Sequence, residues 1–121
     1  MLVDHHCHLD FPDFAPDLDG VVGRANAAGV GMLVTISTRV RRFVETLRIA
    51  ETYPQVFCSV GTHPHYAHEE LDIAVEEIVR LSRNPNVVAC RAVRHDHGRI
   101  ECLDAVFRPV EIGHGHPVAR P

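Results

Sequence analysis

The sequence predicts an α/β fold in which parallel strands alternate with amphipathic helices. Short apolar runs recur along residues 1–90, and they lack the polar alternation of half-exposed strands. Between the runs, apolar residues are spaced three and four apart, as on one face of a helix. The centres of the runs are separated by roughly 30 residues, which is the length of a β-α unit. This alternation favours a parallel, right-handed arrangement.

The first unit begins with a strand at Leu2–Val3, and the Pro and Asp residues over 12–19 predict a loop. In the helix that follows, Asp17 is the expected N-cap and Gly29 the expected C-terminal stop. Met32–Ser37 is a continuous run of mainly apolar and β-branched residues without polar alternation, which predicts a strand covered on both faces. The apolar face of the helix consists of Leu18, Val21, Val22, Ala25 and Ala28.

Two more units follow the same pattern. Thr38 is the expected cap of a second helix, which precedes a strand at Val56–Val60. Asp72 is the expected cap of a third helix, which precedes a strand at Val87–Cys90. The apolar residues of these helices are Val40, Phe43, Val44, Leu47 and Ala50 in the second, and Ile73, Val75, Ile78, Val79 and Leu81 in the third.

The pattern stops after Cys90. Residues 91–121 contain five Arg, four His, three Gly and three Pro, which is a turn-forming composition. One short helix is expected there, over the apolar cluster Leu103–Phe107. The chain is therefore divided into a β/α region over 1–90 and a divergent, irregular tail over 91–121.

Composition limits the function classes. A chain of 121 residues that is 45% hydrophobic, with net charge −4, is expected to form one globular domain with no general attraction to nucleic acid. The N-terminus lacks a signal-peptide pattern, and no stretch reaches the ~20 apolar residues of a membrane span. We therefore expect a cytoplasmic protein without membrane contact. Its four cysteines, which form no CxxC pair, are expected to be reduced.

His6 and His8 are the first candidate site residues. In a strand, residues two apart point to the same face, about 6.6 Å apart along the backbone, so both imidazoles can converge on one metal ion. Zn, Fe, Ni and Cu suit such ligands, and added carboxylates would admit Mn or Mg. Asp4 shares this face and could orient a ligand. Histidines near a strand end can equally be solvated or simply hydrogen bonded.

His63 and His65 are the second candidate pair, directly after the third expected strand. In β/α folds, ligands bind at the carboxyl ends of parallel strands, so both histidine pairs are expected at one end of the sheet. Pro64 biases His63 toward an extended backbone. A plain polar turn is the alternative interpretation.

Other polar groups carry weaker signals. Arg39, Arg41 and Arg42 could meet a phosphate, although such a run is more often a solvated helix face. The segments His95–His97 and His114–His116 imitate ligand spacing, but they lie in the irregular tail, where accidental spacing is the better explanation.

Two segments carry a family resemblance. Residues 3–10 read VDHHCHLD and residues 60–65 read VGTHPH. Together they strongly resemble signatures of the TatD family of metal-dependent hydrolases, many of which are deoxyribonucleases. The resemblance runs over residues 1–89, through 28–30 and 34–36 in the order of the family.

The resemblance implies a TIM-type (β/α) barrel, of which this chain would hold only about the first four strands, since a full barrel needs about 250 residues. It implies that His6 and His8 are metal ligands. It places His63 and His65 near the metal centre and the substrate phosphate. The implied cofactors are divalent ions, two per site in the family, which could be Mg, Mn or Zn.

The sequence departs from the family at Ala92, which occupies the expected place of a Glu that bridges two metals. Later histidine and aspartate ligands have no counterparts in the chain. All twelve basic residues are Arg, which suggests GC-rich coding, and the tail after Cys90 resembles an out-of-frame reading of such a gene. The encoding DNA would test this hypothesis, which requires that another frame after codon 89 restores a Gly-Glu-x-Gly-Leu-Asp segment.

Three functional hypotheses follow. The first is a TatD-type hydrolase that acts on phosphodiester bonds of DNA and is impaired or inactive as this shortened chain, with no assignable catalytic base. The second is a non-catalytic half-barrel that binds metal weakly and associates with itself through exposed edges. The third is a relative of the polymerase-and-histidinol-phosphatase phosphoesterases, although the segment at 61–65 favours TatD.

Overall fold

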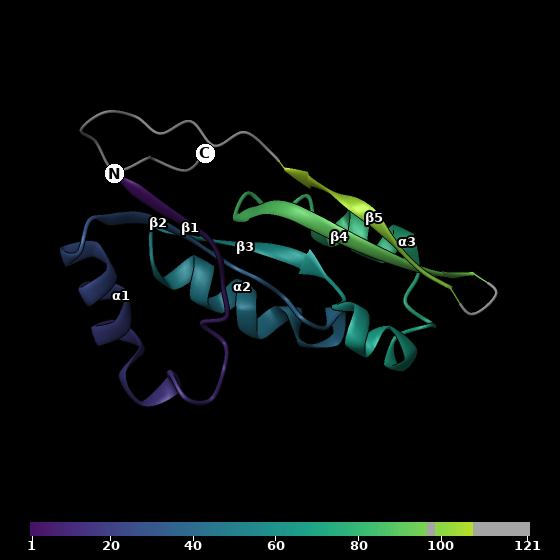
Figure 1. Cartoon of the computed structure of the whole chain (residues 1–121), viewed down its shortest axis with the longest axis horizontal. Helices are drawn as coiled ribbons and strands as arrows, with labels where there is room; N and C mark the ends of the chain where they lie inside the picture. Colours follow the sequence, from purple (N-terminus) through teal and green to yellow (C-terminus); the bar gives the residue numbers. More distant parts are fainter. Residues whose placement is uncertain (97–98, 108–121) are drawn as a thin grey trace.

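The computed structural model describes the backbone of residues 1–96 and 99–107 and the side chains of residues 1–91 (Figure 1). The strands are β1 (Leu2–Cys7), β2 (Val30–Thr35), β3 (Val56–Gly61), β4 (Val87–Asp96) and β5 (Arg99–Phe107). The helices are α1 (Leu18–Ala27), α2 (Phe43–Thr52) and α3 (Val75–Leu81). Short 3-10 turns precede them: η1 (Ala15–Asp17), η2 (Val40–Arg42) and η3 (Pro64–Glu69).

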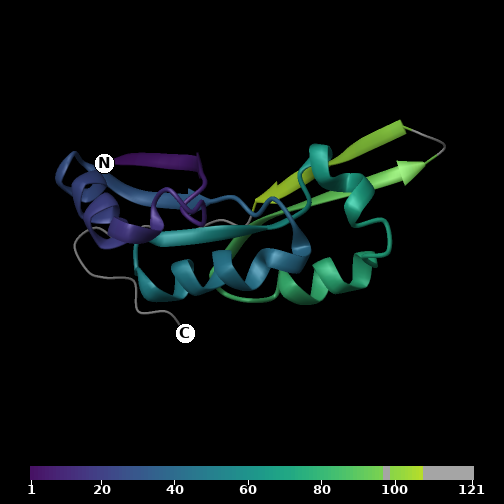
Figure 2. The same ribbon diagram turned by 90° about the horizontal axis from the view of Figure 1, so that it is seen from below.

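The described strands form one sheet in the order β1-β2-β3-β4-β5. The first four strands pair in parallel, and β5 runs antiparallel to β4. Figure 2 shows α2 and α3 on the same side of this sheet. The predicted α/β class, with parallel strands and alternating helices, is therefore confirmed.

The β3 strand is the middle strand of the described sheet, and all six of its residues are buried. Because side chains alternate between the faces of a strand, Val56, Cys58 and Val60 join the main core, whereas Phe57 joins a smaller cluster with Val34 and Val88. The sequence predicts burial on both faces for the strand at Met32–Ser37, and there Leu33 joins the main core while Val34 joins the smaller cluster. The main core includes Val22 of α1, Phe43 and Ala50 of α2, and Ile78 of α3.

The helices lie where the apolar spacing predicts them, but their N-termini are not capped as expected. Asp17 does precede α1, yet its carboxylate pairs with Arg24 at 2.9 Å and caps nothing. The predictions for Thr38 and Asp72 were wrong, because α2 follows η2 and the N-cap of α3 is Ala74. Asp72 pairs instead with Arg41. At the predicted end of α1, Gly29 has φ +88°, a conformation that glycine tolerates best.

The chain after Cys90 contains more regular structure than its composition indicates. β4 continues to Asp96 and pairs antiparallel with β5, with Cys90 opposite Val106 and Ala92 opposite Leu103. The prediction of a short helix at Leu103–Phe107 was therefore wrong. A short apolar cluster fits a helix or a strand equally well, and the pairing with β4 decides that this segment is a strand. The rest of the expected irregular tail, residues 108–121, lies outside the described residues. Along the described chain, every helix is too short or too polar to cross a membrane.

Candidate active site

His6 and His8 lie at the carboxyl end of β1. Their ring centroids are 5.3 Å apart and the rings are nearly perpendicular, with an interplanar angle of 81°. His6 is exposed, and His8 is half-buried. The two rings therefore lie side by side, as the spacing of two residues along a strand predicts. Asp4 accepts a hydrogen bond from the backbone N–H of His6 at 3.0 Å, so it orients the strand and not a ring.

The His8 ring is held in one orientation by two neighbours. Its Nδ1 lies 3.1 Å from the carbonyl oxygen of Ile36, and the ring of Phe11 stacks on it with centroids 4.8 Å apart and an angle of 15°. A carbonyl only accepts hydrogen bonds, so Nδ1 carries the proton in the neutral ring. Nε2 of His8 therefore has a lone pair for a metal ion, in the arrangement typical of histidine ligands.

Cys7 lies between these histidines in the sequence but faces the other side of the strand. Its thiol lies 3.4 Å from the carbonyl oxygen of Val34 and packs against the main core. Burial, aided by the charge of Asp4, raises the pKa of Cys7 to about 12. Because its thiol packs toward the core, away from the rings of His6 and His8, Cys7 is not a candidate ligand.

His63 and His65 follow β3, with ring centroids 4.8 Å apart. The backbone of His63 is extended, at φ −67° and ψ 141°, as Pro64 predicts. Nδ1 of His63 accepts a hydrogen bond from the backbone N–H of His65 at 3.1 Å. The neutral His63 ring therefore carries its proton on Nε2, which makes that atom a donor.

Electrostatics links the two pairs. Partial burial lowers the pKa of His63, and the positive charges of His65, Arg91, His8 and His6 lower it further. The charges of His8 and His6 act on His63 because the carboxyl ends of parallel strands meet at one edge of the sheet. The neutral form of His63 is thereby favoured. Within residues whose side chains are described, no group of three His, Cys, Asp or Glu could hold a metal ion.

The remaining candidates are engaged elsewhere or lie outside the description. Arg39 pairs with Glu69 at 2.7 Å and stacks over the ring of Tyr66, while Arg42 pairs with Glu45 at 2.7 Å. With Arg41 held by Asp72, this run is an ion-paired surface, and no observation directs it to a phosphate. His95 and Asp96 lie in β4 without described side chains, and His97 and His114–His116 lie outside the described residues.

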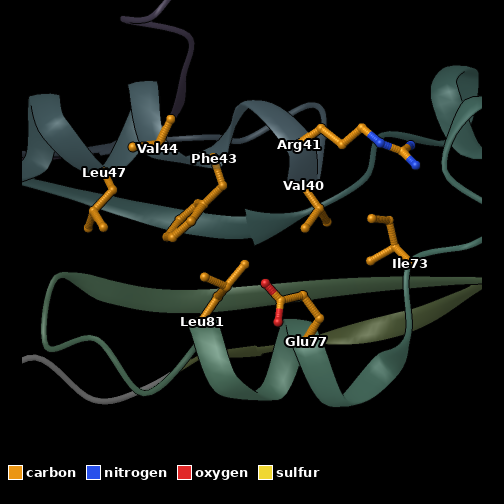
Figure 3. Close-up of a pocket in the computed structure, with 8 residues that line it drawn as sticks. All are labelled: Val40, Arg41, Phe43, Val44, Leu47, Ile73, Glu77 and Leu81. Carbon is orange, nitrogen blue, oxygen red and sulfur yellow. The ribbon is translucent and has the colours of Figure 1, made fainter.

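A pocket of about 370 Å³ lies between α2 and α3, and none of its lining residues is a histidine (Figure 3). Its wall is mostly apolar, formed by side chains such as Phe43, Leu47 and Leu81. It belongs to the helix-covered side of the sheet, whereas the candidate site lies at the carboxyl ends of the strands.

Sequence reasoning missed Glu70, which is buried beneath the His63 loop and binds backbone groups of the loop after β2. A single acidic residue in a polar loop carries no sequence signal for such a role. Its partners, Val40 and Arg41, lie about 30 residues away along the chain and only the fold brings them together.

The protein is thus of the class of β/α proteins that carry histidine pairs at the carboxyl ends of parallel strands, here at the ends of β1 and β3. The family model described as TatD related DNase matches residues 3–97, and the chain therefore belongs to that family. The resemblance noted in the sequence is confirmed.

Individual relatives agree. An uncharacterized metal-dependent hydrolase of Escherichia coli, YjjV, is 34% identical over 84 residues, which is 69% of this chain and 32% of the relative. The 3'-5' ssDNA/RNA exonuclease TatD of Salmonella typhimurium is 37% identical over 89 residues, or 73% of this chain and 34% of the relative. The chain thus spans about a third of the length of these curated relatives.

A solved structure extends the agreement to three dimensions. The crystal structure of the TatD homologue YJJV from Escherichia coli superposes with a TM-score of 0.65 at 36% identity. The superposed region covers 73% of this chain and 35% of the YJJV chain. The β/α units described above are therefore those of a TIM-type barrel, as the resemblance implied.

Proposed function

We propose that this chain is a metal-dependent hydrolase of the TatD type that acts on phosphodiester bonds of DNA. One observation carries the proposal: the two histidine pairs share an edge of the sheet, and their ring nitrogens have complementary roles. Nε2 of His8 is an acceptor fit for a metal ion, whereas Nε2 of His63 is a donor fit for a phosphate oxygen.

His6 and His8 are the residues that would hold a divalent cation, either Mg, Mn or Zn. When bound there, such an ion would supply activation of a water molecule and neutralisation of charge on a scissile phosphate. The fit is supported by the 5.3 Å separation of the two rings and by the hydrogen bond that fixes the His8 tautomer. Two imidazoles alone predict weak affinity, because catalytic zinc sites use three protein ligands.

His63 and His65 are proposed to bind the substrate. The lowered pKa of His63 keeps its ring neutral near pH 7, so that Nε2–H donates to an oxygen without adding a charge. Donors that are held before the substrate arrives stabilise developing charge without reorganisation. DNA as the substrate is supported by the family description and by the TatD relative that is named an ssDNA/RNA exonuclease.

Low turnover is part of the proposal, because Ala92 stands where the resemblance places a bridging Glu.

Self-association of the chain is also part of the proposal. Leu2 and Val3 are exposed on β1, the outer strand of the sheet, and a second copy of the chain could cover them. A light-scattering mass of a clean monomer would contradict the self-association.

A nuclease assay on single-stranded DNA with Mg²⁺ or Mn²⁺ tests the activity. We expect slow, metal-dependent cleavage that is lost when His6→Ala and His8→Ala are combined. His5→Ala is the matched control, because His5 is an exposed neighbour on β1 and should leave cleavage unchanged. Cleavage that persists in the double variant contradicts the assigned metal site. Metal binding without cleavage favours the non-catalytic alternative.

A further inference from the structure

Glu70 is a buried acidic residue to which the proposed chemistry gives no role. Only 6% of its surface is exposed. Its Oε2 accepts hydrogen bonds from the backbone N–H of Val40 at 2.9 Å and from the hydroxyl of Thr62, and its Oε1 accepts from the backbone N–H of Arg41 at 2.9 Å. Burial of a carboxylate is costly unless donors replace water, and these three donors do so.

The donors come from two different loops. Val40 and Arg41 lie in η2, after β2, whereas Thr62 lies after β3 and directly precedes His63. The backbone N–H of Val40 lies in the first turn of η2 and has no acceptor within that turn. Glu70 therefore supplies the capping that Thr38 was expected to give, and it does so from the neighbouring loop.

Further hydrogen bonds join the same two loops on both sides of Thr62. The backbone N–H of His63 donates to the carbonyl oxygen of Thr38 at 2.8 Å. The hydroxyl of Ser37 lies 3.2 Å from the carbonyl oxygen of Gly61. Glu70 is the only charged member of this set, and charge-assisted hydrogen bonds are about twice as strong as neutral ones.

We propose that Glu70 is a positioning residue that locks the loop carrying His63 and His65 onto the loop after β2. It fixes the backbone from which the His63 ring extends, and through the His65 N–H it fixes the ring tautomer. The relevance of this lock to substrate binding rests on the proposed function of His63. The lock itself concerns only the hydrogen bonds described above.

A purely local capping role makes a different prediction. If Glu70 only caps η2, its loss frees the amides of Val40 and Arg41 and no others. If it locks the two loops together, the amide of His63 also loses protection, although its own partner is Thr38 and not Glu70.

The test is amide hydrogen exchange by NMR in Glu70→Gln, with Glu69→Gln as the matched control. The glutamine is isosteric, but its NH₂ faces backbone donors and leaves at least one of them without an acceptor. We expect the His63 amide to exchange on the order of tenfold faster in Glu70→Gln. Glu69 is exposed and pairs with Arg39, so Glu69→Gln should leave that amide unchanged. Unchanged exchange at His63 in Glu70→Gln overturns the proposal.

A second readout follows the His63 ring by its ¹⁵N chemical shifts. The native ring should show a single Nε2–H tautomer, and Glu70→Gln should show a mixture of tautomers. A cap that acts only on η2 would leave the ring signals as they are. Exchange at two core amides reports whether the core remains folded. The N–H of Leu33 donates to the carbonyl oxygen of Gln55, and the N–H of Cys58 donates to that of Asn86.

If Glu70→Gln loses protection at those core amides, Thr62→Val replaces it as the test variant. It removes one donor and leaves the carboxylate bound to two. We expect faster exchange at His63 in Thr62→Val and native exchange in Thr62→Ser, which keeps the hydroxyl. Equal exchange in Thr62→Val and the wild type overturns the proposal. Neither readout requires catalysis, so a failed nuclease assay with the expected exchange rejects the proposed function and leaves the lock intact.

Discussion

The carboxyl ends of β1 and β3 each present two histidines, but the chain supports them differently. All six residues of β3 are buried, whereas five of the six residues of β1 are exposed. After β3, the loop after β2 holds the backbone of Gly61 and His63 through hydrogen bonds of Ser37 and Thr38. On β1, His6 is exposed, and only His8 is fixed by Ile36 and Phe11.

This difference reflects the place of each strand in the sheet. An interior strand receives partners on both edges and side chains on both faces, while an outer strand receives fewer of each. The proposed phosphate-binding pair is therefore preorganised by the chain, and the proposed metal-binding pair is more open. Mutations near β3 should accordingly cost more stability than equivalent mutations on β1 or in α1.

The largest effect is expected for Gly61→Ala at the end of β3. Gly61 has φ +150°, and a Cβ there would lie 2.1 Å from the carbonyl oxygen of Arg91. Backbone strain and steric overlap together predict a loss of about 3 kcal/mol in the free energy of unfolding. Urea denaturation measures it.

Gly23→Ala is the matched control for that variant. A Cβ at Gly23 in α1 meets nothing within 4 Å, and alanine favours a helix by roughly 0.5–1 kcal/mol over glycine. We therefore expect a gain in stability. Equal losses in both variants would break the distinction between the two regions.

A smaller effect is expected for Val60→Ala on β3. The side chain is 0% exposed in the main core, so its truncation should cost about 2 kcal/mol. The same change at Val3, which is 44% exposed on β1, should cost less than about 0.5 kcal/mol. The two urea midpoints measure the contrast, and a Val3→Ala loss as large as that of Val60→Ala would show that β1 is covered in solution.

The smallest effect concerns pH. Burial lowers the pKa of His63 below its ordinary value of 6.5, so the unfolded chain binds this proton more readily than the folded chain. The stability due to neutral His63 is present above pH 6.5 and is lost as the pH falls through the folded pKa. His63→Gln should therefore lose less stability than the wild type between about pH 7.5 and pH 5.5.

The control for this measurement is His68→Gln, which alters an exposed histidine of η3. Equal changes of pH dependence in the two variants would show that the effect does not depend on the His63 site. If His63→Gln and the wild type have the same pH dependence, the His63 ring is solvated like any surface histidine.

Much of this comparison was predictable from the sequence, and the reason is physical. Runs such as Val56–Val60 have no polar alternation, which indicates a buried parallel strand, and apolar spacing located the helices. The His63 backbone followed from Pro64. The position of both histidine pairs at one end of the sheet followed from the β-α order.

The errors concern contacts between residues that are distant in sequence. Caps at Thr38 and Asp72 were expected from local rules. Instead, Glu70 accepts a hydrogen bond from the Val40 N–H at the start of η2, and Arg41 pairs with the carboxylate of Asp72, in each case across about 30 residues of sequence. β5 was missed because its pairing with β4 decides its structure. The acceptor and donor roles of His8 and His63 depend on Ile36 and on the His65 backbone, which the residue types alone do not reveal.

The most direct test of the central claim is an NMR titration with Mn²⁺, which broadens the signals of nearby nuclei. We predict that the backbone amide signals at positions 6 and 8 broaden first, and that His6→Ala combined with His8→Ala abolishes this broadening while His5→Ala preserves it. Broadening that is spread evenly over the exposed histidines, or that survives in the double variant, would contradict a metal site at the end of β1.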